Sequence, residues 1–152
     1  MSRSSFISLS FCSALVALLL LPACSRVSAP ARKADKIVTM EVTGYCKCGK
    51  CCGWYRNWYG RPTISYGKNK GKKKAVGITA RGTKAAPGTI AADTSKYPFG
   101  TIMYIDGYGY GVVEDRGGAI KGEKIDLFFT SHEQALQWGR VKKNVRVWKT
   151  GR

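Results

Sequence analysis

Three aspartates in the second half of the chain are the residues whose type and setting could carry chemistry. Asp93 follows the apolar stretch GTIAA, Asp115 ends YGVVED, and Asp126 lies inside KIDLFF. Aspartate has poor β propensity, so a carboxylate in the middle of a strand-like stretch must face solvent, a partner or a groove. Grouped carboxylates could also bind a hard cation, although the surrounding positive charge disfavours it. The simpler interpretation of each is a turn or capping residue, which is what we expect of Asp106 in the hairpin signal Asp-Gly.

A tight cysteine cluster is the second candidate for chemistry. Its pattern is C-x-C-x-x-C-C, formed by Cys46, Cys48, Cys51 and Cys52. In an exported chain the oxidising surroundings favour two disulfides, for which three pairings exist. A structural zinc ion is the alternative, although zinc sites usually use two spaced pairs, and a redox role is a third interpretation. We expect no other cofactor, and we expect the single histidine, His132, to lie at the surface.

The N-terminal residues are typical of a targeting signal. Arg3 precedes the apolar run 11–21, which is shorter than the roughly 20 residues that span a bilayer and resembles a signal-peptide core. We therefore expect residues 1–23 to be a signal peptide. The sequence LPAC resembles a bacterial lipobox, so Cys24 is expected to be lipidated and to anchor the protein to a membrane of the cell envelope. Cleavage after Ala31, giving a secreted or periplasmic protein, is the alternative.

The charge of the chain indicates a polyanionic partner. The formal net charge is +17, with 26 Lys and Arg against 9 Asp and Glu, and such a field attracts polyanions. Export argues against nucleic acid and points to the cell wall, its acidic polymers and anionic lipid. Residues 24–36 are small, polar and basic, as in a tether, and residues 37–150 suffice for one domain, expected to be a monomer.

Short apolar runs separated by Gly or Pro turns favour a small β-barrel. The expected strands are in IVTMEVT, VGITA, GTIAAD, GTIMYID, YGVVED, KIDLFF and VRVW, and the lysine-rich stretch SYGKNKGKKK is expected to lack regular structure. Within KIDLFF, alternation places Ile125, Leu127 and Phe129 on one face, and Asp126 and Phe128 on the other.

One short helix is expected near the C-terminus. Thr130 or Ser131 can cap it, and Glu133 or Gln134 completes a capping box. Gly139 ends it. Its buried side is expected to consist of Ala135, Leu136 and Trp138.

Residues 77–148 resemble the three-aspartate, or 3D, domain. The matching segments are GITARGT, GTIAAD, YPFGTIMYIDGYG, VVEDRGGAIKGEKIDLFF, EQALQWG and VRVW. This domain is similar to the C-terminal part of membrane-bound lytic transglycosylase A and to small stationary-phase cell-wall proteins. The resemblance implies an all-β fold, a six-stranded double-psi β-barrel with one short helix near the C-terminus. It would span residues 37–150, with a Cys-rich insertion at 45–60.

The resemblance also implies an activity on peptidoglycan glycan strands. Lytic transglycosylases cleave the MurNAc–GlcNAc β-1,4 bond without water and leave a 1,6-anhydro ring on the muramic acid. The role of single acid/base would fall to Asp126. Asp115 would be the neighbouring carboxylate that raises the pKa of Asp126, and Asp93 would support the cluster by hydrogen bonding. The alternative is a non-catalytic glycan-binding or wall-loosening module, as in expansin-like barrels.

Other residues are expected near such a groove. Thr79 would bind the substrate or an aspartate, and Arg116 could pair with Asp115. Trp54 and Trp58, beside Tyr55 and Tyr59, either stack on sugar rings or form a hydrophobic cluster that covers the barrel. The spacing of four would place 54 with 58 on one face if this segment were helical.

Overall fold

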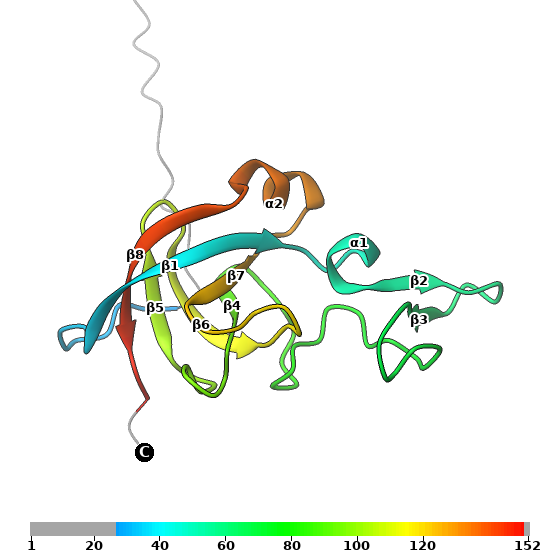
Figure 1. Ribbon diagram of the computed structural model, residues 1–152, viewed down its shortest axis with the longest axis horizontal. Helices are drawn as coiled ribbons and strands as arrows, with labels where there is room; N and C mark the ends of the chain where they lie inside the picture. Colours follow the sequence, from blue (N-terminus) through cyan, green and yellow to red (C-terminus); the bar gives the residue numbers. More distant parts are fainter. Residues whose placement is uncertain (1–26, 151–152) are drawn as a thin grey trace, which may run out of the picture.

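A six-stranded barrel with an arm projecting from one side forms the structure (Figure 1), a computed structural model that describes residues 27–150. The predicted signal peptide and Cys24 lie outside the described residues. Neither helix in the described part is long and apolar enough to cross a membrane. The elements, in chain order, are β1 (Lys36–Tyr45), α1 (Gly49–Cys52), β2 (Trp54–Arg56), β3 (Pro62–Ile64), β4 (Thr89–Ala92), β5 (Ile102–Ile105), β6 (Gly109–Asp115), β7 (Lys124–Phe128), α2 (His132–Trp138) and β8 (Val141–Trp148).

The barrel closes in the strand order β1-β7-β4-β6-β5-β8. Two neighbouring pairs are parallel, β1 with β7 and β4 with β6, and the others are antiparallel. This closed barrel with a helix near the C-terminus confirms the expected fold class. The stretch VGITA, expected as a strand, forms an isolated bridge between Ile78 and Lys84 instead.

Alternation along the strands separates an apolar interior from an outer face. The residues that fill the interior are Met40, Val42, Ile90, Ala92, Met103, Ile105, Val113, Ile125, Leu127, Val145 and Val147, with Tyr97 packed among them. Because successive side chains point to opposite faces, Asp126 lies on the outer face between Ile125 and Leu127, as the KIDLFF pattern predicted.

The helix α2 begins and ends where the sequence predicts. Ser131 caps it, Gln134 completes the capping box, and Gly139 is the C-cap. Its buried side is smaller than expected: Ala135 is buried and Trp138 packs against the core, whereas Leu136 is 67% exposed. A seven-residue helix on the outside of a barrel touches its neighbours along one narrow stripe, and Leu136 falls outside it.

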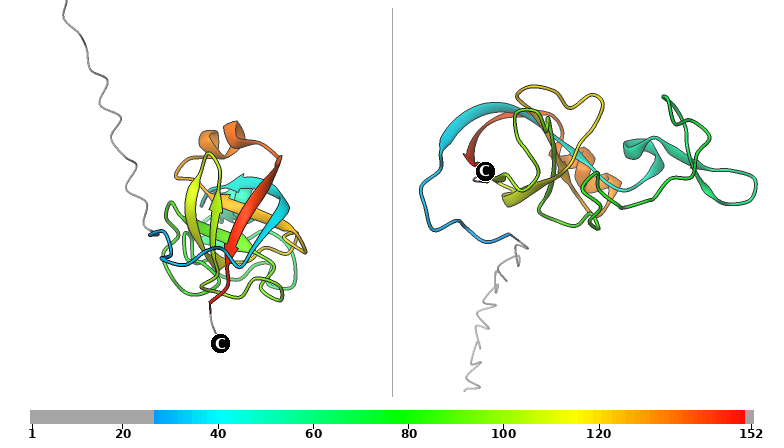
Figure 2. Two further views of the ribbon diagram at one scale, coloured as in Figure 1. Left: turned by 90° about the vertical axis from the view of Figure 1, so that its left-hand side faces the viewer. Right: turned by 90° about the horizontal axis from the view of Figure 1, so that it is seen from below.

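The arm comprises α1, the hairpin of β2 and β3, and the loop 65–88 that returns to the barrel (Figures 1 and 2). Its aromatic segment, Trp54–Arg56, is a strand and not a helix, so the four-residue spacing does not place Trp54 and Trp58 on one face. The lysine-rich part of the loop has no helix or strand of its own, as predicted.

The last residues of the predicted tether pack along β8. The indole Nε1 of Trp148 donates a hydrogen bond to the carbonyl of Arg32 at 2.8 Å, and the amide of Asp35 donates to the carbonyl of Val147 at 2.9 Å. The ordered domain thus extends a few residues ahead of β1.

Gly44 allows α2 to approach β1, and this close approach yields a prediction. A Cβ at Gly44 would lie 2.9 Å from the carbonyl oxygen of Ala135 and 3.0 Å from the ring of Phe129. We expect Gly44→Ala to lower the free energy of unfolding by about 1–3 kcal/mol through overpacking, measured by urea denaturation. Gly118→Ala is the control, because a Cβ there meets nothing within 4 Å. Equal stabilities of the two variants would contradict this account of the packing.

Candidate active site

A cavity of about 560 Å³ lies on the outer face of the barrel. Four adjoining strands, in the order β1-β7-β4-β6, contribute Tyr45, Asp126, Ala91 and Asp115 to its lining. The loop 65–88, the α1 turn and the segment after β6 contribute the rest. The cavity is therefore bounded by the rigid barrel on one side and by the arm and its return loop on the other.

Ala91 on β4 lies between the two aspartates, which are on the strands at either side of it. It pairs with Asp126 on β7 and with Asp115 on β6. Neighbouring strands lie about 4.8 Å apart, so Asp115 and Asp126 are two strands apart, and the small alanine side chain leaves the space above it open. This space is part of the cavity.

A register shift on β6 decides which acid faces the cavity. Ile90 pairs with Val113, but Ala91 pairs with Asp115, so Glu114 is the extra residue between them. Glu114 is buried and accepts a hydrogen bond from the hydroxyl of Thr89 at 3.1 Å. Shifts of this kind re-aim side chains, and here the shift places Asp115 in the cavity.

Asp126 is a partly buried carboxyl with a raised pKa. Burial raises its pKa from 3.8 to about 6, and the negative charge of Asp115 acts in the same direction. The hydroxyl of Thr43 donates to Oδ1 at 3.0 Å and opposes the rise, as does the charge of Lys124. A carboxyl with a pKa of about 6 exchanges protons readily near neutral pH, as a general acid/base must.

Three donors hold Asp115. The hydroxyl of Tyr45 donates to Oδ2 at 3.0 Å, and the main-chain amides of Ala80 and Arg116 donate to Oδ1, each at 2.9 Å. Burial and the adjacent carboxylate raise the pKa of Tyr45, so its hydroxyl stays protonated. Arg116, expected to pair with Asp115 through its side chain, contributes its main-chain amide. The contact with Ala80 also ties the loop 65–88 to the barrel.

Thr79 lines the cavity but its hydroxyl is engaged within its own turn. Oγ1 lies 2.9 Å from Oγ1 of Thr83 and accepts a hydrogen bond from the amide of Thr83 at 3.1 Å. The residue therefore shapes the loop beside Asp115.

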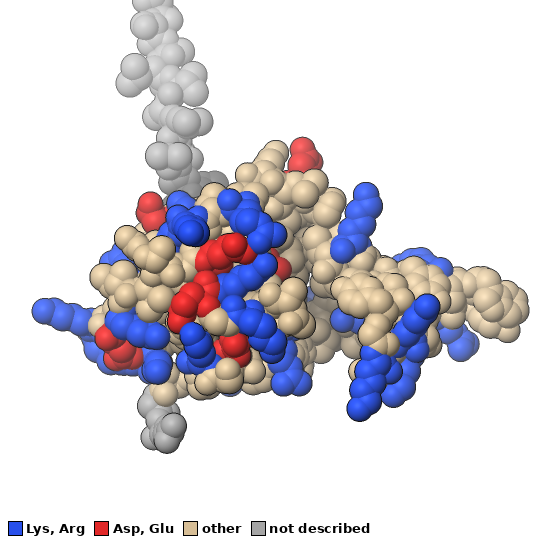
Figure 3. Space-filling model, viewed as in Figure 1, with Lys and Arg blue, Asp and Glu red and all other residues tan. Residues whose placement is uncertain are grey.

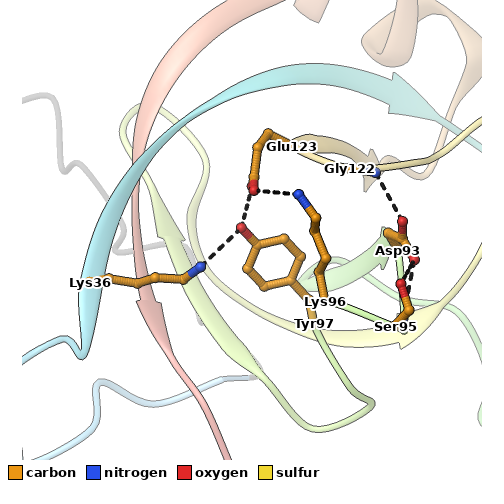
Figure 4. Close-up of polar contacts among 7 residues, drawn as sticks. All are labelled: Lys36, Asp93, Ser95, Lys96, Tyr97, Gly122 and Glu123. Carbon is orange, nitrogen blue, oxygen red and sulfur yellow. Dashed lines mark hydrogen bonds and ion pairs between the residues drawn. The ribbon is translucent and has the colours of Figure 1, made fainter.

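Asp93 does not line this cavity. Its carboxylate accepts hydrogen bonds from the amide of Gly122 at 2.9 Å and from the amide and hydroxyl of Ser95 at 3.1 and 2.7 Å (Figure 4). These donors, Gly122 first, lower its pKa to about 2. Glu123, next to Gly122, accepts a hydrogen bond from Tyr97. Asp93 thus binds the loop between β6 and β7 through Gly122, whereas Asp115 and Asp126 both line the cavity.

Trp54 and Trp58, predicted to contact the substrate, lie in the arm but do not line the cavity of Asp115 and Asp126. Trp58 is 83% exposed and its ring lies on that of Tyr59. Trp54 donates from Nε1 to the carbonyl of Lys47 at 3.0 Å and lines a separate hollow together with His132.

The four cysteines are free thiols in the structure. Cys51 and Cys52 line the cavity wall. His132, expected at the surface, is half-buried against the cluster, with Nδ1 3.6 Å from Sγ of Cys48 and 3.3 Å from Sγ of Cys51.

Thr43 and Tyr45 contact the two aspartates, and the sequence analysis missed both. Thr43 and Tyr45 are two positions apart on β1, and Thr43 directly follows the interior residue Val42. Alternation along the strand therefore predicts that both face outward. Thr43 meets Asp126 through the parallel pairing of β1 with β7, across 83 positions of the chain, and Tyr45 reaches Asp115 on β6, across 70 positions.

The outer surface around the barrel is mixed in charge. Glu41 forms ion pairs with Lys124 and Arg140, and Glu123 forms one with Lys96. Figure 3 shows acidic side chains on one face of the barrel set among Lys and Arg. Cationic groups thus lie close to most of the few acids on this face.

The raised pKa of Asp126 makes a prediction about stability. Because its pKa is higher in the folded protein than its ordinary 3.8, wild type loses stability as pH rises through about 6. We expect Asp126→Asn to be more stable than wild type at pH 8 by roughly 1–3 kcal/mol, with the gap closing below pH 4. The measurement is thermal or urea unfolding across this range. Asp106→Asn, on an exposed turn, is the control, and a gap for Asp126→Asn that is independent of pH would contradict the prediction.

Comparisons with known proteins bear on residues of this site. The family model of the 3D domain matches residues 88–150, which include Asp93, Asp115 and Asp126. Two curated proteins of Bacillus subtilis (strain 168) are similar. YabE, named for cell wall shaping, is 29% identical over 122 residues, covering 80% of this chain and 25% of YabE. The cell wall-binding protein YocH is 45% identical over 58 residues, covering 38% of this chain and 20% of YocH. The chain thus spans a quarter or less of the length of these relatives.

Solved structures give weaker matches. Escherichia coli MltA aligns with a TM-score of 0.41 and 24% identity, covering 53% of this chain and 30% of MltA. The lytic transglycosylase LtgG of Burkholderia pseudomallei aligns with a TM-score of 0.40 and 29% identity, covering 52% and 28%. The likeness of this chain to proteins that contain a 3D domain therefore rests on the family model, which matches residues 88–150.

Proposed function

We propose that the protein is a peptidoglycan lytic transglycosylase. It would cleave the MurNAc–GlcNAc β-1,4 bond and form 1,6-anhydro-MurNAc ends, with Asp126 as the single acid/base. The observation that carries the proposal is the Asp126 carboxyl, with a pKa of about 6, beside Asp115 in an open cavity.

The first half of the reaction uses Asp126 as an acid. Thr43 donates to Oδ1 of Asp126, which leaves Oδ2 to carry the proton. That proton passes to the glycosidic oxygen as the bond from this oxygen to C1 of MurNAc breaks. GlcNAc leaves with a free 4-hydroxyl, and positive charge develops at C1.

The second half uses the same carboxyl as a base. Asp126, now ionised, takes the proton of the C6 hydroxyl of MurNAc while O6 bonds to C1, which closes the 1,6-anhydro ring and restores the acid. The nucleophile belongs to the substrate, so proximity supplies much of the rate, and water is not consumed. A hydrolysing glycosidase, by contrast, uses two carboxyl groups with separate roles.

Asp115 would act through its charge. Its three donors, Tyr45, Ala80 and Arg116, fix the carboxylate at the cavity. A fixed negative charge there raises the pKa of Asp126 and stabilises positive charge that develops at C1. Asp93 contributes through the loop 116–123, which it holds.

The names of the relatives and the charge of the chain support the proposed substrate and location. YabE and YocH are named for cell wall shaping and cell wall binding, and a chain of net charge +17 attracts the anionic polymers of the wall. The protein would act as a monomer in the cell envelope, held at a membrane by lipidated Cys24. Exposed Trp58 and Tyr59 could stack on sugar rings at the end of the arm.

A non-catalytic wall-binding module is the second candidate, favoured by the name of YocH. The two functions differ in their need for Asp126. An enzyme without this proton donor loses turnover, whereas a binding module with Asn in its place keeps its shape and most of its affinity.

Analysis of muropeptides tests the proposal. Purified sacculi are incubated with the mature protein, and the released fragments are identified by mass spectrometry. We expect 1,6-anhydro-MurNAc ends from wild type and from Asp106→Asn, and a loss of roughly 10²–10⁴-fold with Asp126→Asn. Because the acid must be protonated, kcat/KM should fall about tenfold per pH unit above about pH 6.

Two outcomes would contradict the proposal. Reducing MurNAc ends in place of anhydro ends would mean hydrolysis by water. No new ends, with wild type and Asp126→Asn co-sedimenting equally with the wall, would favour the binding module.

A further inference from the structure

Three thiols and one imidazole converge at the base of the arm. Cys46 follows the end of β1, Cys48 caps α1, Cys51 lies in α1, and His132 is the first residue of α2. Their ligand atoms, three Sγ and one ring nitrogen, all lie within 4.8 Å of one another. The histidine is more than eighty residues away in sequence, so the fold itself assembles this group.

We propose that Cys46, Cys48, Cys51 and His132 bind one zinc ion in a structural site. Zinc sits about 2.3 Å from thiolate sulfur and about 2.0 Å from imidazole nitrogen in a tetrahedron, which requires S–S separations of about 3.8 Å and S–N separations of about 3.6 Å. The Sγ atoms of Cys46 and Cys51 are 3.8 Å apart. Nδ1 of His132 lies 3.6 and 3.3 Å from Sγ of Cys48 and Cys51. A disulfide needs about 2.05 Å.

Cys52 is excluded from this set. Its Sγ donates a hydrogen bond to the carbonyl of Cys46 at 3.1 Å, and it lines the cavity that contains Asp115 and Asp126. Zinc sites commonly take four protein ligands when they are structural, and His132 supplies the fourth in place of Cys52. The sequence pattern of four cysteines therefore divides into three ligands and one thiol of the cavity wall.

The backbone around the cluster is arranged to hold thiolates. The amide of Cys51 points at Sγ of Cys48 at 3.5 Å, as donors to metal-bound sulfur do. Gly53 ends α1 with φ of 59°, where a Cβ would lie 2.3 Å from the ring of Tyr66, so this turn requires glycine. On the other side, the capping box of Ser131 and Gln134 fixes the first turn of α2, which carries His132.

Zinc binding would join three segments, of which β1 and α2 already pack together at Gly44. The thiols of Cys46, Cys48 and Cys51 lose their protons, and His132 binds as neutral imidazole. The ion would then connect the end of β1, the base of the arm and the start of α2. Because Cys51 also lines the cavity, the metal would fix the wall of the candidate active site. The site does not use Asp126, so it is independent of the proposed function.

Metal analysis of matched cysteine variants tests the site. The full chain is expressed with zinc, purified without chelator, and analysed by inductively coupled plasma mass spectrometry. We expect about one zinc per chain in wild type and in Cys52→Ser, and a loss of at least about tenfold in occupancy in Cys51→Ser and His132→Ala. Adjacent Cys51 and Cys52 make a matched pair, since each variant removes one thiol from the same turn.

X-ray absorption of the zinc-loaded wild type checks the ligands without a mutation, so poor folding of a variant cannot obscure the result. Three sulfur neighbours and one nitrogen are expected. A four-sulfur shell, or zinc retained by His132→Ala and lost by Cys52→Ser, would overturn the assignment. Two disulfides in the purified, metal-free protein, identified by peptide mapping, would overturn it as well.

Hydrogen exchange tests the consequence for the arm. Removal of zinc by a chelator should speed amide exchange across residues 46–64, while the barrel strands β4 and β7 keep their protection. Unchanged exchange in the arm after the metal has left would refute a structural role for the ion.

Discussion

The burial of one carboxyl on the outside of a closed barrel is the constraint on which the site depends. The interior of the barrel is filled by apolar side chains, so Asp126 has to face outward, where an aspartate would ordinarily be solvated. The arm, through α1 and its loop 65–88, covers that position and forms a cavity over it. Partial desolvation then raises the pKa of Asp126 to about 6, because burial disfavours the charged form. The proposed chemistry follows from this single electrostatic effect.

The loop 65–88, which covers Asp126, is held in place by Asp115, and the charge of Asp115 also raises the pKa of Asp126. Asp115 binds the amide of Ala80 in the loop and the hydroxyl of Tyr45 on the barrel, and its charge acts on Asp126. The register shift that turns Asp115 toward the cavity and Glu114 away from it is therefore both structural and electrostatic. The proposed zinc site would hold the other wall, where Cys51 and Cys52 also pack against the apolar cluster of Tyr45, Ala91 and Phe128.

Local patterns in the sequence predicted the barrel strands, the orientation of Asp126 and the caps of α2, because these depend on alternation and on near neighbours. The family resemblance supplied the barrel closure and the proposed role of Asp126. The partners of the site could not be predicted from local patterns. Thr43, Tyr45 and His132 reach their positions through pairings between distant segments, and the hydrogen bonds of Asp93 depend on a loop conformation that alternation does not specify. The Trp54–Arg56 segment became a strand because it pairs with β3, which outweighed its helix-like spacing.

The most direct test of the account is a pH titration of Asp126 in the intact protein, in which the carbon-13 NMR shift of its side-chain carboxyl is measured at each pH. The account predicts a midpoint near pH 6 and a lower midpoint in Asp115→Asn, since removal of a neighbouring negative charge favours ionisation. A midpoint near the ordinary 3.8 in wild type would mean that the carboxyl is fully ionised at neutral pH, and the proposed acid step would lose its proton donor.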